Sequence, residues 1–330
     1  MSVRWGIIGA GGVAKRRTIP EILKARDATL SAVMVRDQSR ADELAIEFGA
    51  KHAFSDWREL LKCADVDAVH IATPVNLHRE QVIAAAEAGK HVMCDKPMAL
   101  SPAECADMIA ACKSNGVHLQ VCFLMRFGSV YRQLKEMVSE GRFGEIIEAR
   151  ATIFKGLPIT DDAWRVKKEL GGGGPLMDLG AHSIDLLTYL TGPVKTAYAI
   201  SMNRASTWDV EDSISVLMRS ESGAACVVGH SFKAPGGDTV VEIQGTKASA
   251  QVSTPPGTKQ AVLRISDTDG ITTEPVPFEN FYQLQVEHFA DCLSGKADPL
   301  APGEAGLHNM AIIEAAYRSC ESGKAEDIQA

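Results

Sequence analysis

The stretch VRWGIIGAGGVA, residues 3–14, decides the fold. It begins with a short apolar run typical of a buried β-strand and continues with the pattern G-x-G-x-x-A. In this pattern the first glycine allows a tight turn, the second lets backbone N–H groups approach a pyrophosphate, and the alanine lets a helix pack closely on the strand. The pyrophosphate then lies at the helix N-terminus, where the helix dipole favours an anion. The stretch predicts a dinucleotide-binding turn formed by Gly9, Gly11, Gly12, Val13 and Ala14.

Strands and helices alternate through the first third of the chain. Further apolar strands are expected at 30–35, 66–73, 91–95 and 117–123, and helices at 39–48, at 78–88 and from Ser101 onward. Ser101 and Glu104 form an S-x-x-E capping box. Continuous apolar strands separated by amphipathic helices are typical of a parallel sheet covered on both faces. We therefore predict an NAD(P)-binding Rossmann domain, a doubly wound parallel sheet, over residues 1–123.

The pattern changes after residue 123. Helices are expected near 129–139, 176–190 and 281–294, whereas 194–266 reads as successive strands separated by Gly, Pro and Asp turns. This order predicts a C-terminal α+β domain over residues 124–330, with a mostly antiparallel open sheet. A final amphipathic helix, about 303–322, can pack on either domain. The fold class is α/β with this second domain appended.

Charge and hydropathy exclude several classes of protein. The 330 residues carry a net charge of −8, which gives no electrostatic support to nonspecific binding of nucleic acid or anionic membranes. No stretch approaches the roughly 18 uninterrupted apolar residues of a membrane-spanning helix. The one compact basic run near the start, Lys15-Arg16-Arg17, fits either a solvated helix face or a phosphate contact.

The cysteines point to a reducing compartment. Eight are present, none in a C-x-x-C pair, and most lie inside expected strands or helices. Free buried thiols of this kind are typical of the cytoplasm, where we expect this protein to work. The chain has no H-E-x-x-H motif and no Cys/His quartet at metal-binding spacing, so we expect no catalytic metal.

The end of the second strand sets the choice of cofactor. An acid about 20 residues after the glycine turn would bind the ribose diol of NAD. Here Val35 stands at that position and Arg36 follows it. Arginine can cover the adenine and pair with a 2′-phosphate, which favours NADP(H) over NAD(H). Asp37 leaves an alternative open, because it can either reach the ribose or cap the next helix.

Another strand, at 91–95, ends on Asp95-Lys96-Pro97. Burying a lysine beside apolar residues costs free energy unless the charge is paired or has a function. Such folds bind their ligands at the carboxyl ends of the parallel strands, so we expect Lys96 to lie beside the cofactor. A proline in such a tight turn is a candidate for a cis peptide bond.

A second polar cluster follows four glycines at 171–174. Asp178, His182 and Asp185 stand at i, i+4 and i+7 of the helix expected there, so they share one face. Histidine is the natural proton carrier near neutral pH, and a neighbouring carboxylate orients it. An acid early in a helix also favours the helix dipole, and a single helix histidine is often structural. We interpret the cluster as catalytic.

Four segments together resemble the glucose–fructose oxidoreductase/inositol dehydrogenase (Gfo/Idh/MocA) family. They are GAGGVA at 9–14, ATPVNLH at 72–78, AGKHVMCDKP at 88–97 and GGGPLMDLGAHSID at 172–185. Their order and spacing match those of the family, and the two-domain layout matches over essentially the whole chain. The resemblance implies an NAD(P)-dependent oxidoreductase acting on CH–OH groups. It would transfer a hydride between nicotinamide and a sugar, cyclic polyol or keto-sugar.

The resemblance also implies roles for individual residues. Lys96 matches the lysine of the family's E-K-P motif beside the nicotinamide, while Asp178 and His182 match its substrate-binding and proton-transferring pair. His182 would be the general acid/base, and Lys96 would polarise the reacting oxygen. Cofactor contacts are implied for Thr73, Pro74, Asn76, His78, Asp95 and Lys96. Substrate contacts are implied for Lys96, Arg126, Trp164, Arg165, Asp178 and His182.

The sequence departs from the family pattern at two positions, and three other functions stay possible. Asp95 replaces the usual glutamate of E-K-P, and Val35 replaces the acid common in NAD-preferring members. The alternatives are an NAD-retaining glycosidase of the same family, a non-catalytic nucleotide-binding regulator, and a Schiff-base lyase using Lys96. Exposed sheet faces in such second domains commonly pair, so we expect a homo-oligomer, either a dimer or a tetramer.

Overall fold

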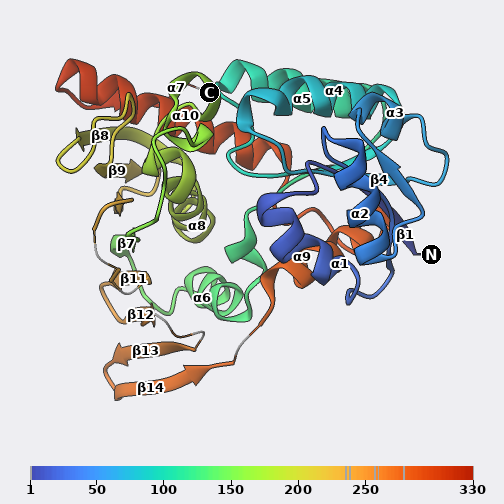
Figure 1. The fold of residues 1–330 in the computed structure, drawn as a ribbon. Helices are drawn as coiled ribbons and strands as arrows, with labels where there is room; N and C mark the ends of the chain where they lie inside the picture. Colours follow the sequence, from blue (N-terminus) through green and yellow to red (C-terminus); the bar gives the residue numbers. More distant parts are fainter. Residues whose placement is uncertain are drawn as a thin grey trace. The chain divides into compact units, whose positions relative to one another are not determined.

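The computed structural model describes residues 2–234, 236–237, 239–255, 258, 260–277 and 279–329. It forms two compact units (Figure 1). Unit 1 contains residues 1–127 and 280–307, and unit 2 contains residues 128–279 and 308–330.

Unit 1 is built on a six-stranded, fully parallel sheet in the order β3-β2-β1-β4-β5-β6. Its strands are β1 (Val3–Ile8), β2 (Ala28–Met34), β3 (His52–Phe54), β4 (Ala68–Ile71), β5 (His91–Cys94) and β6 (Leu119–Val121). This is the strand order of a doubly wound dinucleotide-binding fold, and the order reverses between β1 and β4. The predicted parallel sheet is confirmed. The short strand β3 was not predicted.

Helices cover both faces of this sheet. They are η1 (Ala14–Thr18), α1 (Ile19–Ile22), α2 (Gln38–Phe48), α3 (Trp57–Leu61), η2 (Val75–Leu77), α4 (His78–Glu87), α5 (Pro102–Ser114), η3 (Leu124–Phe127) and α9 (Phe281–Leu293). The predicted capping box at α5 is present: the Ser101 side chain accepts a hydrogen bond from the Glu104 N–H. The Glu104 carboxylate reaches back to the Leu100 N–H at 3.0 Å.

Helix α9 belongs to unit 1, although the sequence-based division at residue 123 counted it with the second domain. Its residue Phe289 packs on Trp5 of β1, with ring centroids 5.4 Å apart, and both side chains are fully buried. At the surface, the Arg26 guanidinium donates to the Asp291 carboxylate. The helix therefore closes one face of the parallel sheet although it begins 160 residues after β6 ends.

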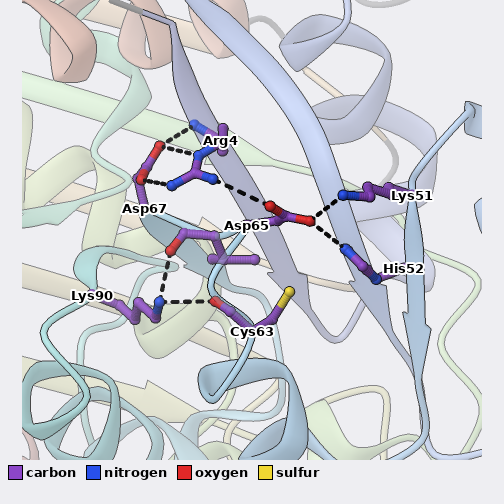
Figure 2. Close-up of polar contacts among 8 residues, drawn as sticks. Arg4, Lys51, His52, Cys63, Asp65, Asp67 and Lys90 are labelled. Carbon is purple, nitrogen blue, oxygen red and sulfur yellow. Dashed lines mark hydrogen bonds and ion pairs between the residues drawn. The ribbon is translucent and has the colours of Figure 1, made fainter.

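Charged side chains join the amino ends of several unit 1 strands (Figure 2). Arg4 on β1 donates to Asp67, which precedes β4, and also pairs with Asp65. Asp65 in turn accepts hydrogen bonds from Lys51 and from His52 at the start of β3. The Lys51 and His52 hydrogen bonds lower the pKa of Asp65 to about 2, so the network stays charged at neutral pH.

Unit 2 is built on a nine-stranded sheet in the order β14-β13-β12-β11-β7-β10-β9-β8-β15. Its strands are β7 (Ile146–Phe154), β8 (Val194–Met202), β9 (Ser213–Ser220), β10 (Ala225–Ser231), β11 (Thr239–Gly245), β12 (Ser249–Thr254), β13 (Ala261–Asp267), β14 (Gly270–Val276) and β15 (Glu326–Asp327). Every neighbouring pair is antiparallel except β7 with β10. The predicted, mostly antiparallel open sheet is confirmed, although the strand β7 near its centre was not predicted.

The helices of unit 2 are α6 (Ser129–Ser139), η4 (Trp164–Val166), α7 (Lys168–Gly171), η5 (Leu176–Gly180), α8 (Ala181–Thr191) and most of α10 (Gly303–Ser322). Helix α8 packs on β7 and β10. Strand β9 alternates buried Ile214, Val216 and Met218 with exposed residues, so one face of the sheet is covered and the other is open. Among the described helices, none has both the length and the apolar character needed to span a membrane.

Two of the buried histidines, His70 and His230, make the stability of the chain depend measurably on pH. Burial lowers the pKa of His70 on β4 and of His230 on β10 to about 4, from an ordinary value of 6.5. Both are neutral in the folded protein at pH 7, whereas the unfolded chain takes up protons on them below pH 6.5. Their contribution to stability is complete above pH 6.5 and is lost progressively between pH 6.5 and pH 4.

We therefore expect the free energy of unfolding to fall by about 2 kcal/mol per buried histidine between pH 8 and pH 5. In the variant His230→Gln that part of the pH dependence should disappear, whatever the variant's stability at pH 8. Urea unfolding at the two pH values measures the difference directly. An unchanged pH dependence in this variant would show that His230 titrates normally in the folded protein.

Candidate active site

The glycine turn after β1 leaves open space where a dinucleotide would approach. Gly9 has a φ of +85°, and a Cβ there would lie 2.9 Å from the Ala72 carbonyl oxygen. Its N–H and that of Ala10 donate to the Met34 carbonyl at the end of β2. At Gly11, by contrast, no atom lies within 4 Å of a Cβ position. The turn is tight at its first glycine and open at its second, which fits a bound pyrophosphate.

The end of β2 carries the residues predicted to select the cofactor. Asp37 is the N-cap of α2, and its Oδ1 accepts a hydrogen bond from the Arg40 N–H at 2.8 Å. Arg36 is exposed beside it. A surface hollow of about 500 Å³ adjoins this point and is lined by Lys15, Asp37, Ser39, Arg40, Glu43, Leu44 and Glu47. Of the two roles left open for Asp37, the structure shows helix capping.

The basic run at 15–17 divides into one paired cation and two exposed ones. Lys15 donates to the Glu47 carboxylate at 2.7 Å, while Arg16 and Arg17 are exposed on the turn η1. An exposed ion pair of this kind contributes little stability. Arg16 and Arg17 therefore lie on a solvated face, and the phosphate contact that the sequence left open stays a prediction.

The last residue of the loop 73–78, His78, fixes this loop from inside the protein. The His78 Nε2 lies 2.9 Å from the Thr73 carbonyl oxygen, and its Nδ1 lies 3.2 Å from the carbonyls of Pro97 and Met98. The ring is fully buried, and burial lowers its pKa. His78 thus joins two loops from inside the protein, whereas Asn76 is exposed on the outside. We expect His78 to support the cofactor loop rather than to touch a ligand.

The segment after β5 begins with Asp95 and Lys96. The Lys96–Pro97 peptide bond is cis, as expected. The Asp95 carboxylate accepts a hydrogen bond from the Lys96 N–H at 3.1 Å. The backbone N–H of Asp95 donates to the Ile71 carbonyl of β4. Pro97 is buried, but Asp95 and Lys96 are partly exposed at the carboxyl edge of the sheet.

Arg126 in η3 is largely buried in unit 1. Its NH1 donates to the Leu300 carbonyl at 2.8 Å, and its guanidinium lies 5.9 Å from the centre of the Phe123 ring. With only 9% of its surface exposed, Arg126 joins η3 to the segment that precedes α10. The contact of Arg126 with substrate stays a prediction.

In unit 2, Asp178 and His182 lie half-buried on one continuous helix. Its first turn, η5, is a π-helix, a feature often found at functional sites, and α8 continues it as an α-helix. The Asp178 carboxylate is 3.4 Å from Nε of Arg165, whose guanidinium stacks 4.6 Å from the centre of the Trp164 ring. The structure therefore brings together three residues predicted from two separate motifs.

Asp185 does not share this exposed stripe. It is only 1% exposed, although the i, i+4, i+7 spacing placed it with Asp178 and His182. Asp185 and His182 both lie in α8, most of whose residues are buried, so the spacing could not show that Asp185 would be covered.

The sequence analysis missed Glu211, which holds the glycine segment before this helix. Its carboxylate accepts hydrogen bonds from the Gly174 and Leu176 N–H groups at 3.0 and 3.1 Å. The only signal in the sequence is a pair of adjacent acids, Glu211 and Asp212, just before a strand.

Two groups of side chains bring possible metal ligands within 4.8 Å of one another. His52, Cys63 and Asp65 form the first, but Lys51 already binds the Asp65 carboxylate. His70, Asp95 and Cys122 form the second, at the carboxyl edge of the parallel sheet, where the His70 Nε2 is 3.7 Å from the Cys122 sulfur. That distance fits a thiol–imidazole hydrogen bond.

Comparisons with known proteins agree with this geometry. Residues 3–123 match the model of the oxidoreductase family with an NAD-binding Rossmann fold, and residues 131–251 match the GFO/IDH/MocA C-terminal domain. A 1,5-anhydro-D-fructose reductase of Ensifer adhaerens is 30% identical over 99% of this chain and 98% of its own length.

The chain belongs to the Gfo/Idh/MocA family. Another family member, a D-xylose 1-dehydrogenase (NADP(+)) of Haloferax volcanii, is 29% identical over 98% of this chain and 99% of its own length. An aldose–aldose oxidoreductase of Caulobacter crescentus, solved with glycerol, has 27% identity and a TM-score of 0.91, covering 99% and 100% of the two chains. The resemblance found in the sequence is confirmed. Gfo/Idh/MocA membership makes this chain an NAD(P)-binding oxidoreductase.

The two glycines of the turn should respond differently to substitution by alanine. Gly11→Ala adds a methyl group in open space, so the free energy of unfolding should stay within about 0.5 kcal/mol, whereas NAD(P)H binding should weaken at least tenfold, as roughly expected for a blocked pyrophosphate. Gly9→Ala is the matched comparison and should destabilise the fold itself, because its Cβ meets Ala72. Thermal unfolding and fluorescence titration with NADPH measure the two effects. Unimpaired cofactor binding by Gly11→Ala would place the pyrophosphate elsewhere.

Proposed function

We propose that this protein is an NADP(H)-preferring dehydrogenase or reductase that acts on a CH–OH group of a sugar, cyclic polyol or keto-sugar. The observation that carries the proposal is the Trp164–Arg165–Asp178 arrangement beside His182 in unit 2. It combines a ring that can stack on a sugar face, charged groups that can bind hydroxyls and a proton carrier. The names of the relatives support the substrate class, since they include a reductase of anhydrofructose and a dehydrogenase of xylose.

His182 is the general acid/base of the proposed reaction. In the direction of oxidation it removes the hydroxyl proton from the substrate. The glycine turn and the loop 73–78 would hold the nicotinamide cofactor, which would supply the hydride acceptor for the carbon that bears this hydroxyl. In the direction of reduction His182 returns the proton to the carbonyl oxygen. Asp178 binds substrate and orients His182, and Arg165 pairs with the Asp178 carboxylate.

Lys96 polarises the reacting oxygen. As an ammonium group it donates a hydrogen bond to that oxygen and stabilises the negative charge that develops there. Asp95 fixes the backbone at this point, because its carboxylate accepts the Lys96 N–H. Trp164 and Arg165 complete the substrate contacts, with Arg126 as a further candidate.

The preference for NADP(H) rests on the end of β2. Asp37 is engaged as a helix cap and Val35 carries no acid, so this position offers no carboxylate dedicated to a ribose diol. The exposed guanidinium of Arg36 supports pairing with a 2′-phosphate. Thr73, Pro74 and Asn76 contribute the loop that lines the nicotinamide half.

We also propose that the protein is a cytoplasmic homo-oligomer that pairs through the open face of the unit 2 sheet. Tyr198, Ile200 and Leu217 lie on β8 and β9 with 37%, 54% and 50% of their surfaces exposed. Neighbouring exposed apolar side chains on a sheet are typical of an interface. Sedimentation or light scattering of the wild type and of Leu217→Glu would distinguish a dimer or tetramer from a monomer.

Removing either reacting group should stop the chemistry without releasing the cofactor. A screen of sugars and inositols with both cofactors first identifies the substrate. His182→Ala should then lower kcat by roughly 10²- to 10⁴-fold because the proton carrier is lost, and Lys96→Ala by roughly 10²- to 10³-fold. Fluorescence titration should give an NADPH affinity within a few-fold of the wild type.

Lys62→Ala is the control for the loss of a lysine, since Lys62 pairs only with surface Glu59. It should keep full activity. Full activity in His182→Ala or Lys96→Ala would refute the mechanism. Hydrolysis of a nitrophenyl glycoside without net reduction of cofactor would identify the glycosidase instead.

Arg36 should determine the cofactor ratio. Arg36→Ala removes a charge-assisted contact with the 2′-phosphate, so Kd for NADPH should rise about tenfold or more while Kd for NADH stays within about twofold. Arg58→Ala is a matched loss of charge at an exposed arginine that stacks on Trp57 and pairs with Glu80. It should leave both constants unchanged. Equal changes for the two cofactors in Arg36→Ala would rule out recognition of a 2′-phosphate by this residue.

A further inference from the structure

A buried carboxylate stands at the start of the helix that carries Asp178 and His182. Glu211 is 8% exposed and accepts three hydrogen bonds within unit 2. Its Oε2 accepts the Gly174 N–H at 3.0 Å, and its Oε1 accepts the Leu176 N–H at 3.1 Å and the Tyr317 hydroxyl at 3.0 Å. Two of these donors lie in the glycine segment and the helix, and the third lies on α10.

The glycine segment is packed directly against these two side chains. A Cβ at Gly173 would lie 1.9 Å from the Tyr317 hydroxyl, and one at Gly174 would lie 2.0 Å from the Glu211 carbonyl oxygen. At these two positions glycine permits a close contact that a larger side chain would block. Tyr317 and Glu211 therefore fix the path of the backbone immediately before η5.

The hydrogen bonds from Gly174 and Leu176 to Glu211 lie at the N-terminal end of the helix. The first N–H groups of a helix have no partners within it, and a negative charge at that end is favoured by the dipole. Glu211 supplies both the acceptors and the charge from outside the helix. Asp178 stands only two residues after Leu176, so its position and its approach to Arg165 follow from where the helix starts.

We propose that Glu211 and Tyr317 are positioning residues. They hold the start of the helix so that Asp178 and His182 are correctly placed to contact the substrate. This inference rests on the proposed function. A misplacement of about 1 Å in a reacting group can cost on the order of 10²-fold in rate, so a fixed helix start matters for turnover. Burial raises the pKa of Glu211, and its three hydrogen bonds favour the ionised form that the contact uses.

Glu211→Gln tests the carboxylate with almost no change of shape. Either orientation of the new amide leaves its NH₂ group facing a backbone N–H, at Gly174 or at Leu176. Tyr317→Phe is the milder variant, because it removes one hydroxyl and keeps the ring. Asp212→Asn is the matched control: Asp212 is also buried and accepts from Ala205, Ser206 and Ser213, but it does not contact the glycine segment.

We expect kcat to fall roughly 10- to 100-fold in Glu211→Gln and several-fold in Tyr317→Phe, with the NADPH Kd within about twofold of the wild type. The pH profile of kcat should also shift in Glu211→Gln, because the Asp178 carboxylate moves relative to His182. Asp212→Asn should lower Tm to a similar extent but keep kcat and its pH profile. Equal loss of kcat in Glu211→Gln and Asp212→Asn, or an unchanged pH profile, would overturn the inference.

Amide hydrogen exchange over residues 174–182 separates this inference from the proposed function, because it needs no turnover. Faster exchange there in Glu211→Gln, but not in Asp212→Asn, supports the positioning role, and unchanged exchange overturns it. A wild-type protein that turns over no sugar or polyol with either cofactor would instead refute the proposed function.

Discussion

Parallel pairing of β1 with β2 and β4 is the constraint on which the rest of unit 1 depends. Because the strands run in one direction, all of their carboxyl ends lie on one edge of the sheet. The glycine turn, Arg36, the loop 73–78 and the Asp95–Lys96 pair each follow a strand end and so gather on that edge. Their local sequences are unrelated, and only the sheet makes them neighbours.

The sequence predicted the parts of the fold that depend on local pattern. The apolar strands of unit 1, the capping box at α5 and the alternating strands after residue 194 all have the expected period or spacing. Strand β7 lacked a strong signal because its buried face is mostly alanine, at Ala149 and Ala151. Helix α9 was recognised as a helix, but its partner could not be read from the sequence, because the contact with Trp5 joins residues almost 300 positions apart.

The candidate site, like the fold, was predictable from the sequence only where a local pattern marks it. Motifs named the side chains, but not which of them would be engaged inside the protein. The His78 ring is buried with its two nitrogens facing three carbonyl oxygens, and Asp37 caps a helix. Asp185 is covered because most of α8 is buried, which the helical spacing alone did not show. Glu211 had no motif, since its role comes from hydrogen bonds to residues more than 30 positions away, at Gly174 and Leu176.

The place of α9 in the chain bears on how the protein is made. Ribosomes release this helix only after all of β7–β14 has been synthesised, yet its Val286 and Phe289 cover Trp5 on the first strand. Until then the nascent sheet of unit 1 carries an uncovered apolar face, of the kind that aggregates or recruits chaperones. A fragment ending at residue 127 would carry the same face permanently, so the nucleotide-binding half of this protein is not a separable module.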